Sequence, residues 1–329
     1  MEIPKKEVLE NYENGYGHSS MNGTLKTPIQ PKIENSESSF NFVELGCIRT
    51  RNKVICCDFS SDGKFLASAG HDKKTVIWNM ETLQTDTTPE ENQYVITDVR
   101  FRPNSTQFAT ASFDKSIRLW DAAKPGHCLH AYTAHPSQIL SLDFHPKKND
   151  VFCFSDASDE VRYWDINPLS CARLSKQAGS AHVRFQPITG KLLAAASDEM
   201  VTVYDVENDR ESHSFQGHSG LINYLSWDHN GDYLASVSED SARVWSLASG
   251  ECIHELRSNG DRFHSCLFHP NHSGLLVIGG ERNLALWNMV EHKRITLAAH
   301  ERIIAAVANS AVTGMIASAS HDFSVKLWK

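Results

Sequence analysis

The sequence predicts an all-β fold, a seven-bladed β-propeller, and three observations lead to this prediction. An aromatic residue closes a repeated unit seven times, at steps of 42, 44, 40, 41, 42 and 41 residues. This spacing is typical of blade arrays. Within each unit, alternating apolar and polar runs are separated by turn residues, which is the pattern of half-buried strands. The closing residues are Trp78, Trp120, Trp164, Tyr204, Trp245, Trp287 and Trp328.

Each unit contains three strand-like runs in the same order. The first alternates and usually ends in a bulky aromatic residue, as in VICCDF at residues 54–59. A segment rich in Gly, Asn, Asp or Pro follows. It is predicted to be a tight turn, because Gly, Asn and Asp tolerate positive φ and Pro pre-sets the turn conformation. The second run carries small apolar residues, such as FLASAG at residues 65–70, which fit where strands crowd toward a shared axis. The third run leads into the closing aromatic residue, as in TVIW at residues 75–78.

The two ends of the repeat region are expected to complete each other. The last unit ends at Lys329, directly after its third strand, so its fourth strand is missing. The segment FNFVELGCI, residues 40–48, has strand character but no partner in the first unit. We therefore predict that residues 40–48 form the outer strand of the seventh blade and close the ring, which leaves only short, protected edges. The predicted propeller domain covers residues 40–329.

Residues 1–39 are predicted to be a disordered tail. They are rich in Glu, Asn, Ser, Gly, Lys and Pro and contain few large apolar residues. Such a segment cannot bury enough apolar surface to offset the entropy lost on ordering.

The composition excludes several classes of partner. Lys and Arg total 32 against 40 Asp and Glu, a net charge of -8. This balance argues against a general nucleic-acid or membrane-surface binder. No apolar run approaches the roughly 20 residues that cross a bilayer, and the charged N-terminus does not fit a secretion signal. We therefore expect no direct nucleic-acid contact and no membrane association.

Catalysis, metal binding and cofactor binding are not expected either. The 17 histidines do not cluster with Cys or carboxylate residues at ligand spacing. Ser, His and Asp recur once per unit at positions suited to a repeated structural network, and no G-x-S-x-G motif is present. No Gly-rich phosphate loop leads into a helix. The sequence thus predicts a non-enzymatic protein with no cofactor and no small-molecule substrate.

The spacing of His, Ser or Thr, Asp and Trp within the units resembles that of WD40 repeats. The matching residues in the fifth and seventh units are His218, Ser236, Asp240 and Trp245, and His300, Ser318, Asp322 and Trp328. The resemblance implies that each set forms a hydrogen-bonded network inside a blade. An unpaired buried polar group costs roughly 1–3 kcal/mol, so we assign these residues to stability rather than to partner binding.

Five longer stretches resemble the C-terminal propeller of plant LEUNIG-type transcriptional corepressors. They are GCIRTRNKVICCDFSSDGK, HDKKTVIWNMETLQT, TDVRFRPNST, SGECIHEL and VTGMIASASHDFSVKLWK. The resemblance covers about residues 40–329. It implies a nuclear scaffold, with the cytoplasm as a further compartment, that binds transcription factors and adaptor or corepressor subunits. Those corepressors also carry an N-terminal helical module and a glutamine-rich stretch, which the printed sequence does not contain.

Function is expected on one rim of the propeller. The loops that join one blade to the next share a face with the turns between second and third strands. Exposed Arg and aromatic side chains on one face are typical of peptide-binding hot spots, and arginines on a net acidic chain favour an acidic or mixed acidic and apolar peptide. The candidate partner-binding residues are Arg49, Arg51, His71, Phe113, Glu239, Arg302 and His321. A solvated loop surface is the alternative for any one of them.

A second functional class is the substrate receptor of a cullin-type ubiquitin ligase. WD40 proteins of that class usually carry a basic residue two places after the Trp-Asp pair. Here Asp121 is followed by Ala122 and Ala123, and Asp165 by Ile166 and Asn167. The sequence therefore favours the transcriptional scaffold.

Overall fold

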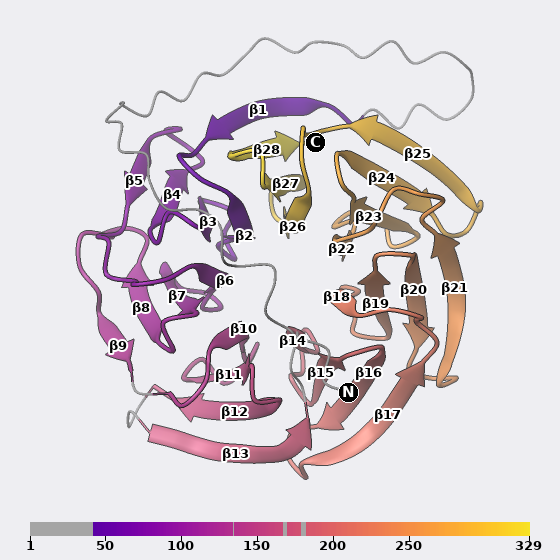
Figure 1. Ribbon diagram of the computed structural model, residues 1–329, viewed down its shortest axis with the longest axis horizontal. Helices are drawn as coiled ribbons and strands as arrows, with labels where there is room; N and C mark the ends of the chain where they lie inside the picture. Colours follow the sequence, from indigo (N-terminus) through magenta and orange to yellow (C-terminus); the bar gives the residue numbers. More distant parts are fainter. Residues whose placement is uncertain (1–41, 134, 167–169, 179–181) are drawn as a thin grey trace, which may run out of the picture.

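Seven four-stranded antiparallel sheets surround a central axis in the computed structural model, which describes residues 42–133, 135–166, 170–178 and 182–329 (Figure 1). In each sheet the strands follow one another from the axis outward, so each sheet is one blade. The predicted seven-bladed propeller is confirmed. The tail predicted for residues 1–39 lies outside the described residues.

The strand bounds follow the repeated units. Blades one and two contain β2 (Val54–Phe59), β3 (Phe65–Gly70), β4 (Thr75–Asn79), β5 (Thr85–Thr87), and β6 (Ile96–Phe101), β7 (Gln107–Ser112), β8 (Ile117–Asp121), β9 (His130–Tyr132). Blades three and four contain β10 (Ile139–Phe144), β11 (Val151–Asp156), β12 (Glu160–Asp165), β13 (Ser170–Ala178), and β14 (His182–Phe185), β15 (Leu192–Ser197), β16 (Met200–Asp205), β17 (Arg210–Gln216). Blades five and six contain β18 (Ile222–Trp227), β19 (Tyr233–Ser238), β20 (Ser241–Ser246), β21 (Glu251–Arg257), and β22 (Ser265–Phe268), β23 (Leu275–Gly279), β24 (Asn283–Asn288), β25 (Lys293–Ala298). Blade seven contains β26 (Ile304–Ser310), β27 (Met315–Ser320), β28 (Ser324–Trp328) and β1 (Glu44–Arg49).

Burial changes across each blade as the strand patterns predict. The second strands are the most buried, and the small residues of β3, including Ala67, are enclosed on both faces. Outer strands are more exposed: β21 alternates between exposed and half-buried residues, and nearly every residue of β25 is exposed. The core therefore lies in the inner three strands and between neighbouring blades, where small side chains allow close approach.

Strand β1 closes the ring, as predicted. It pairs antiparallel with β28, so the outer strand of blade seven comes from the other end of the sequence (Figure 1). Within the described residues the strand begins at Glu44, and residues 40 and 41 of the predicted segment lie outside them. Val43 and Lys329 also exchange two backbone hydrogen bonds, of 2.8 and 3.1 Å. The Phe42 ring stacks on Trp328 with centroids 5.6 Å apart. Backbone pairing and aromatic packing together join the two ends.

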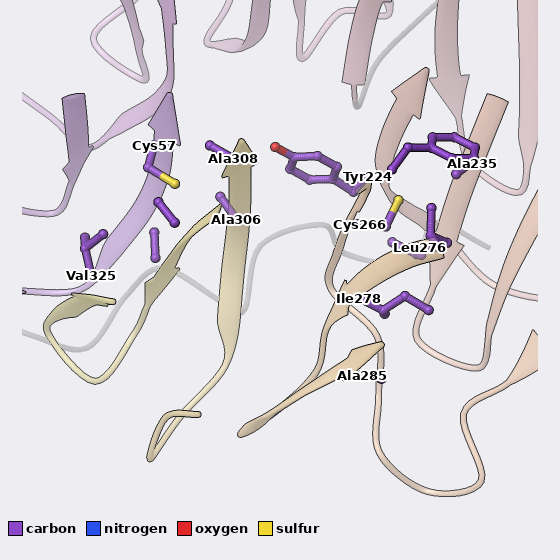
Figure 2. Packing of buried hydrophobic residues seen from close by; sticks show 14 of the residues in the cluster. Cys57, Tyr224, Ala235, Cys266, Leu276, Ile278, Ala285, Ala306, Ala308 and Val325 are labelled. Atoms are coloured by element: carbon purple, nitrogen blue, oxygen red, sulfur yellow. The ribbon is translucent and has the colours of Figure 1, made fainter. Parts of the chain in front are cut away.

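One apolar cluster joins blades five, six, seven and one. Figure 2 shows its inner part, where Tyr224 of β18 extends toward Ala308 of β26. The Tyr224 hydroxyl donates to the Val307 carbonyl at 3.4 Å. Cys266 and the alanines of β26 leave room for this ring, because larger side chains there would fill the space near the axis.

A buried ionic network joins the inner strands of blades two, three and four. Arg184 Nη1 lies 3.1 Å from Asp98 Oδ2 and donates to Ser141 Oγ at 2.9 Å. Arg100 Nε lies 3.3 Å from Asp98 Oδ1, and its Nη2 donates to the Tyr224 hydroxyl at 3.3 Å. Partners on several blades satisfy these buried charges, because an isolated charge there would be very costly.

Candidate functional site

The loops between blades and the turns between second and third strands lie together on what we call the upper face. Backbone hydrogen bonds hold each turn to its loop: His71 N–H donates to Lys53 O at 3.0 Å, and His321 N–H donates to Ile303 O at 2.9 Å. Phe113 of blade two makes the equivalent bond. The turns between first and second strands form the opposite, lower face. The predicted rim residues are all on the upper face.

A basic cluster forms where blades one, six and seven meet on the upper face. Burial is the main cause that lowers the pKa of His321 to about 4, and the neighbouring basic groups Lys53, His71, His264 and Arg302 contribute to the same shift. The His321 imidazole is therefore neutral at pH 7. The structure thus brings together three of the predicted residues, His71, Arg302 and His321, and adds Lys53 and His264, which were not among the predicted partner-binding residues. Both additions come from loops before inner strands, where only the fold shows which side chains meet.

Glu239 belongs to a separate, mixed-charge part of the rim. Arg262 Nη1 lies 3.5 Å from Glu239 Oε2, and Arg262 Nε lies 3.8 Å from Glu281 Oε1. All three side chains are exposed, so these pairs are weak and easily rearranged. The rim therefore changes from basic at blades seven and one to mixed at blades five and six.

The two predicted arginines before blade one are placed differently. Arg49 is the last residue of β1 and lies opposite Ser324, so it is on the outer strand of blade seven, away from the channel mouth. Arg51 follows in the loop and is exposed. It lines a cavity of about 380 Å³ together with His71. The predicted group of three arginines at one opening is thus spread along the upper face.

Aromatic side chains are also present on the upper face. Phe113 is half-buried at its turn in blade two. Tyr94, in the neighbouring loop, is 59% exposed, and its carbonyl accepts a hydrogen bond from Ser112 Oγ at 3.4 Å. Phe323 in blade seven is also exposed, directly after the His321 turn. The sequence reasoning missed Tyr94 and Phe323 because their positions match no repeat position that it used.

Blade seven contains an unbroken side-chain network. Trp328 Nε1 donates to Ser318 Oγ at 2.8 Å, and Ser318 Oγ lies 2.7 Å from His300 Nε2. His300 Nδ1 lies 2.9 Å from Asp322 Oδ2. The chain of contacts runs from the buried indole to the upper face, which satisfies each polar group along it.

In blade five the histidine is linked to the aspartate through a serine hydroxyl. Trp245 Nε1 donates to Ser236 Oγ at 2.8 Å, and His218 Nε2 lies 2.7 Å from the same oxygen. His218 Nδ1 lies 2.9 Å from Ser238 Oγ, which donates to Asp240. Burial is the main cause that lowers the pKa of His218 to about 4. The turn has one residue fewer than in blade seven, so a serine mediates the last contact.

The family comparison agrees with these networks. The family described as "WD domain, G-beta repeat" matches residues 45–79, 83–121, 126–165, 209–246 and 292–329. The chain belongs to the WD40-repeat family. The expected resemblance is confirmed, and the hydrogen-bonded sets of blades five and seven are both within matched WD40 segments.

Three relatives show how far this similarity extends. The chain is 54% identical over 325 residues, 98% of its length, to "Transcriptional corepressor LEUNIG_HOMOLOG" of Arabidopsis thaliana. It is 25% identical over 233 residues, 68% of its length, to "Pre-mRNA-processing factor 19" of Oryza sativa subsp. japonica. It is 27% identical over 206 residues, 60% of its length, to "Pre-mRNA-processing factor 19 homolog 2" of Arabidopsis thaliana. The chain spans less than half of these relatives, namely 41%, 44% and 39% of their lengths.

Blades two and three depart from the complete network in different ways. In blade two, Trp120 Nε1 donates to Thr110 Oγ1 at 3.1 Å, so Thr replaces Ser. In blade three, Phe154 takes the Ser position, and Trp164 Nε1 has no hydrogen-bond partner among the described residues. The His135 ring instead packs against Phe154, with centroids 4.9 Å apart. The WD40 repeat thus tolerates loss of this hydroxyl where an aromatic ring fills the space.

Within 42–133, 135–166, 170–178 and 182–329, no group of three or more His, Cys, Asp or Glu side chains is placed to hold a metal ion. Over the same ranges, no helix has the length and apolar character needed to cross a membrane. The expected lack of cofactor and membrane association remains a prediction from the sequence.

Proposed function

We propose that the chain is the propeller of a transcriptional corepressor, a non-enzymatic nuclear scaffold that binds peptide segments of transcription regulators and of adaptor or corepressor subunits. The observation that carries this proposal is 54% identity over 98% of the chain to a protein named as a transcriptional corepressor. The similarity covers the whole propeller, including all seven blades. The cytoplasm remains a second compartment for the proposed scaffold.

The upper face supports a peptide-binding role. It combines exposed arginines, including Arg51 and Arg302, with the exposed aromatic side chains of Tyr94 and Phe323. Interface hot spots are enriched in such residues, because they offer large contact area and directed hydrogen bonds. Basic side chains on a chain of net charge -8 would also attract and orient an acidic partner.

Reversing the charge of Arg49 and Arg51 should weaken capture of transcription regulators from nuclear extract. Both side chains are exposed, so Arg49→Glu with Arg51→Glu should leave the melting temperature nearly unchanged. We expect slower association, by about tenfold at low salt, because steering of an acidic partner is lost. The difference should shrink as salt screens exposed charges. Surface plasmon resonance with a captured partner would measure both effects.

A matched control is available on the lower face. Lys147 and Lys148 are exposed in the turn after β10, so Lys147→Glu with Lys148→Glu changes the net charge equally. This control should keep the association rate near that of the unaltered chain. If both double variants slow association alike, net charge rather than the upper face governs capture, and the proposed site is wrong.

A further inference from the structure

Blade one lacks the histidine that completes the network in blade seven. Thr50 stands four residues before Val54 of β2, as His300 stands four residues before the equivalent first residue of β26. The Thr50 hydroxyl donates to Asn52 O at 2.8 Å, within its own loop. Ser68 Oγ and Trp78 Nε1 are buried and have no hydrogen-bond partner among the described residues. Blade one is therefore an incomplete copy of the blade-seven network.

Blade two also lacks the histidine, but other side chains fill the space. Asn92 stands at the corresponding position and is 3% exposed. Arg118 Nη1 donates to Asn92 Oδ1 at 2.6 Å and lies 3.0 Å from Asp114 Oδ2. In blade one the residue that matches Arg118, two places before the closing Trp, is Val76. The shorter valine cannot fill the equivalent space.

A cavity of about 380 Å³ lies at this end of blade one. Its wall includes Val76 and, from the outer strand, Thr87. Val76 is the cross-strand partner of Ser68 and stands two residues before Trp78 on β4. Cross-strand partners and residues two apart point to the same side of a sheet. The cavity therefore adjoins the side of the blade that carries the unpartnered hydroxyl and indole.

The charges that line the cavity have a positive excess. Arg51, Lys73 and Lys74 carry positive charge, against Asp72 and Glu90. The Asp72 carboxylate accepts hydrogen bonds from the Arg51 backbone N–H at 3.2 Å and from an adjacent asparagine amide at 2.9 Å. Glu90 lies 3.7 Å from Lys74 Nζ. Arg51 and Lys73 form no ion pair with any described residue, so both are available to an anionic group.

We propose that this cavity binds the phosphoryl group of a phosphoserine or phosphothreonine in an extended peptide; the inference rests on the proposed peptide-binding function. A phosphoryl group carries about two negative charges at neutral pH and three acceptor oxygens. A carboxylate carries one charge and two oxygens, so it can balance only one of the two cations, Arg51 and Lys73, that form no ion pair with any described residue. Arginine and lysine both bind phosphate through charge-assisted hydrogen bonds. The cavity thus selects a phosphorylated side chain over Asp or Glu.

Three fluorescent peptide pools test this inference with the full chain. Each pool has one fixed central residue, phosphoserine, serine or glutamate, between degenerate positions, and fluorescence anisotropy measures binding. We expect the phosphoserine pool to bind at least tenfold more tightly than the glutamate pool. Inorganic phosphate at millimolar concentration should compete with it.

Two variants locate the binding in blade one. Lys73→Gln with Lys74→Gln should reduce the phosphoserine preference to less than threefold, whereas Lys147→Gln with Lys148→Gln on the lower face should retain it. Thr50→His places an imidazole at the position that His300 occupies in blade seven, beside Ser68 and Asp72. This variant should raise the melting temperature and lose the preference, because it fills the cavity.

Several outcomes would overturn the inference. Equal binding of the phosphoserine and glutamate pools would refute phosphate selection while leaving the proposed peptide-binding function intact. Absence of binding by any pool would contradict both proposals. Retention of the preference in the Lys73 and Lys74 variant would place the phosphate site elsewhere, whether or not the Thr50 variant folds.

Discussion

Deletion of residues 1–48 should lower the melting temperature by on the order of 10 °C, whereas deletion of residues 1–39 should change it little. The longer deletion removes nearly all of β1, the outer strand of blade seven. It also removes the Phe42 ring that stacks on Trp328 and the Glu44 carboxylate 3.0 Å from Lys326 Nζ. Burial of one Phe contributes about 1.5–3 kcal/mol, and each lost kcal/mol shifts the melting temperature of a large domain by about 2–4 °C.

Calorimetry of the two truncated chains and of Phe42→Ala would separate the contributions. We expect Phe42→Ala to lie between the unaltered chain and the longer deletion, because it keeps the β1–β28 pairing but loses the stacked ring. If the two truncated chains melt together, the strand pairing that joins the two ends contributes nothing to stability. The closure account would then be incorrect.

Asp322→Ala should destabilise the chain by on the order of 1–3 kcal/mol, because buried donors lose their acceptor. The Asp322 carboxylate accepts a hydrogen bond from Ser324 Oγ at 2.6 Å and lies 2.9 Å from His300 Nδ1. It also accepts from the Glu301 backbone N–H at 3.0 Å. Asp232, exposed in the turn before β19, offers a matched control, and Asp232→Ala should cost much less. Equal losses in urea denaturation would refute the buried-network assignment.

The same Asp322 variant should show a characteristic dependence on pH. Burial opposes ionisation of Asp322, but hydrogen bonds from His300, Ser324 and the Glu301 backbone outweigh it and hold its pKa well below the usual range. A depressed pKa in the folded state means that the unfolded chain binds more protons below about pH 4. The stabilisation is therefore present above that pH and is lost as the pH falls. The difference between Asp322→Ala and the unaltered chain should shrink between pH 5 and pH 3, and a constant difference would contradict this role.

The blades could be predicted from the sequence because their signals are local and repeated. Each closing aromatic residue and each alternating run is a short-range feature, and seven copies of it reinforce one another. Closure was also predictable, since the unpaired segment near Glu44 and the three-stranded last unit require each other. The exact start of β1 was not, because strand ends depend on which backbone groups find partners.

The arrangement of the upper face was less predictable. Arg49 and Arg51 are two residues apart in sequence, yet one lies on the outer strand of blade seven and the other lines the blade-one cavity. The basic group around His321 combines loops of three blades, so no local pattern indicates it. Val76 lines the blade-one cavity, and only the strand register shows that it lies opposite Ser68. Blade one has Thr50 where blade seven has a histidine, and the lack of a residue leaves no sequence motif that would indicate a cavity.

The location of the partner is the most direct test of the central claim, that the upper face binds regulatory peptides. A photoreactive phenylalanine analogue can replace Tyr94, 59% exposed on the upper face, or Val312, 68% exposed on the lower face. After capture from nuclear extract and irradiation, mass spectrometry identifies the cross-linked peptides. We predict that position 94 cross-links peptides of transcription regulators and that position 312 does not. Cross-links from position 312 and none from position 94 would contradict the account.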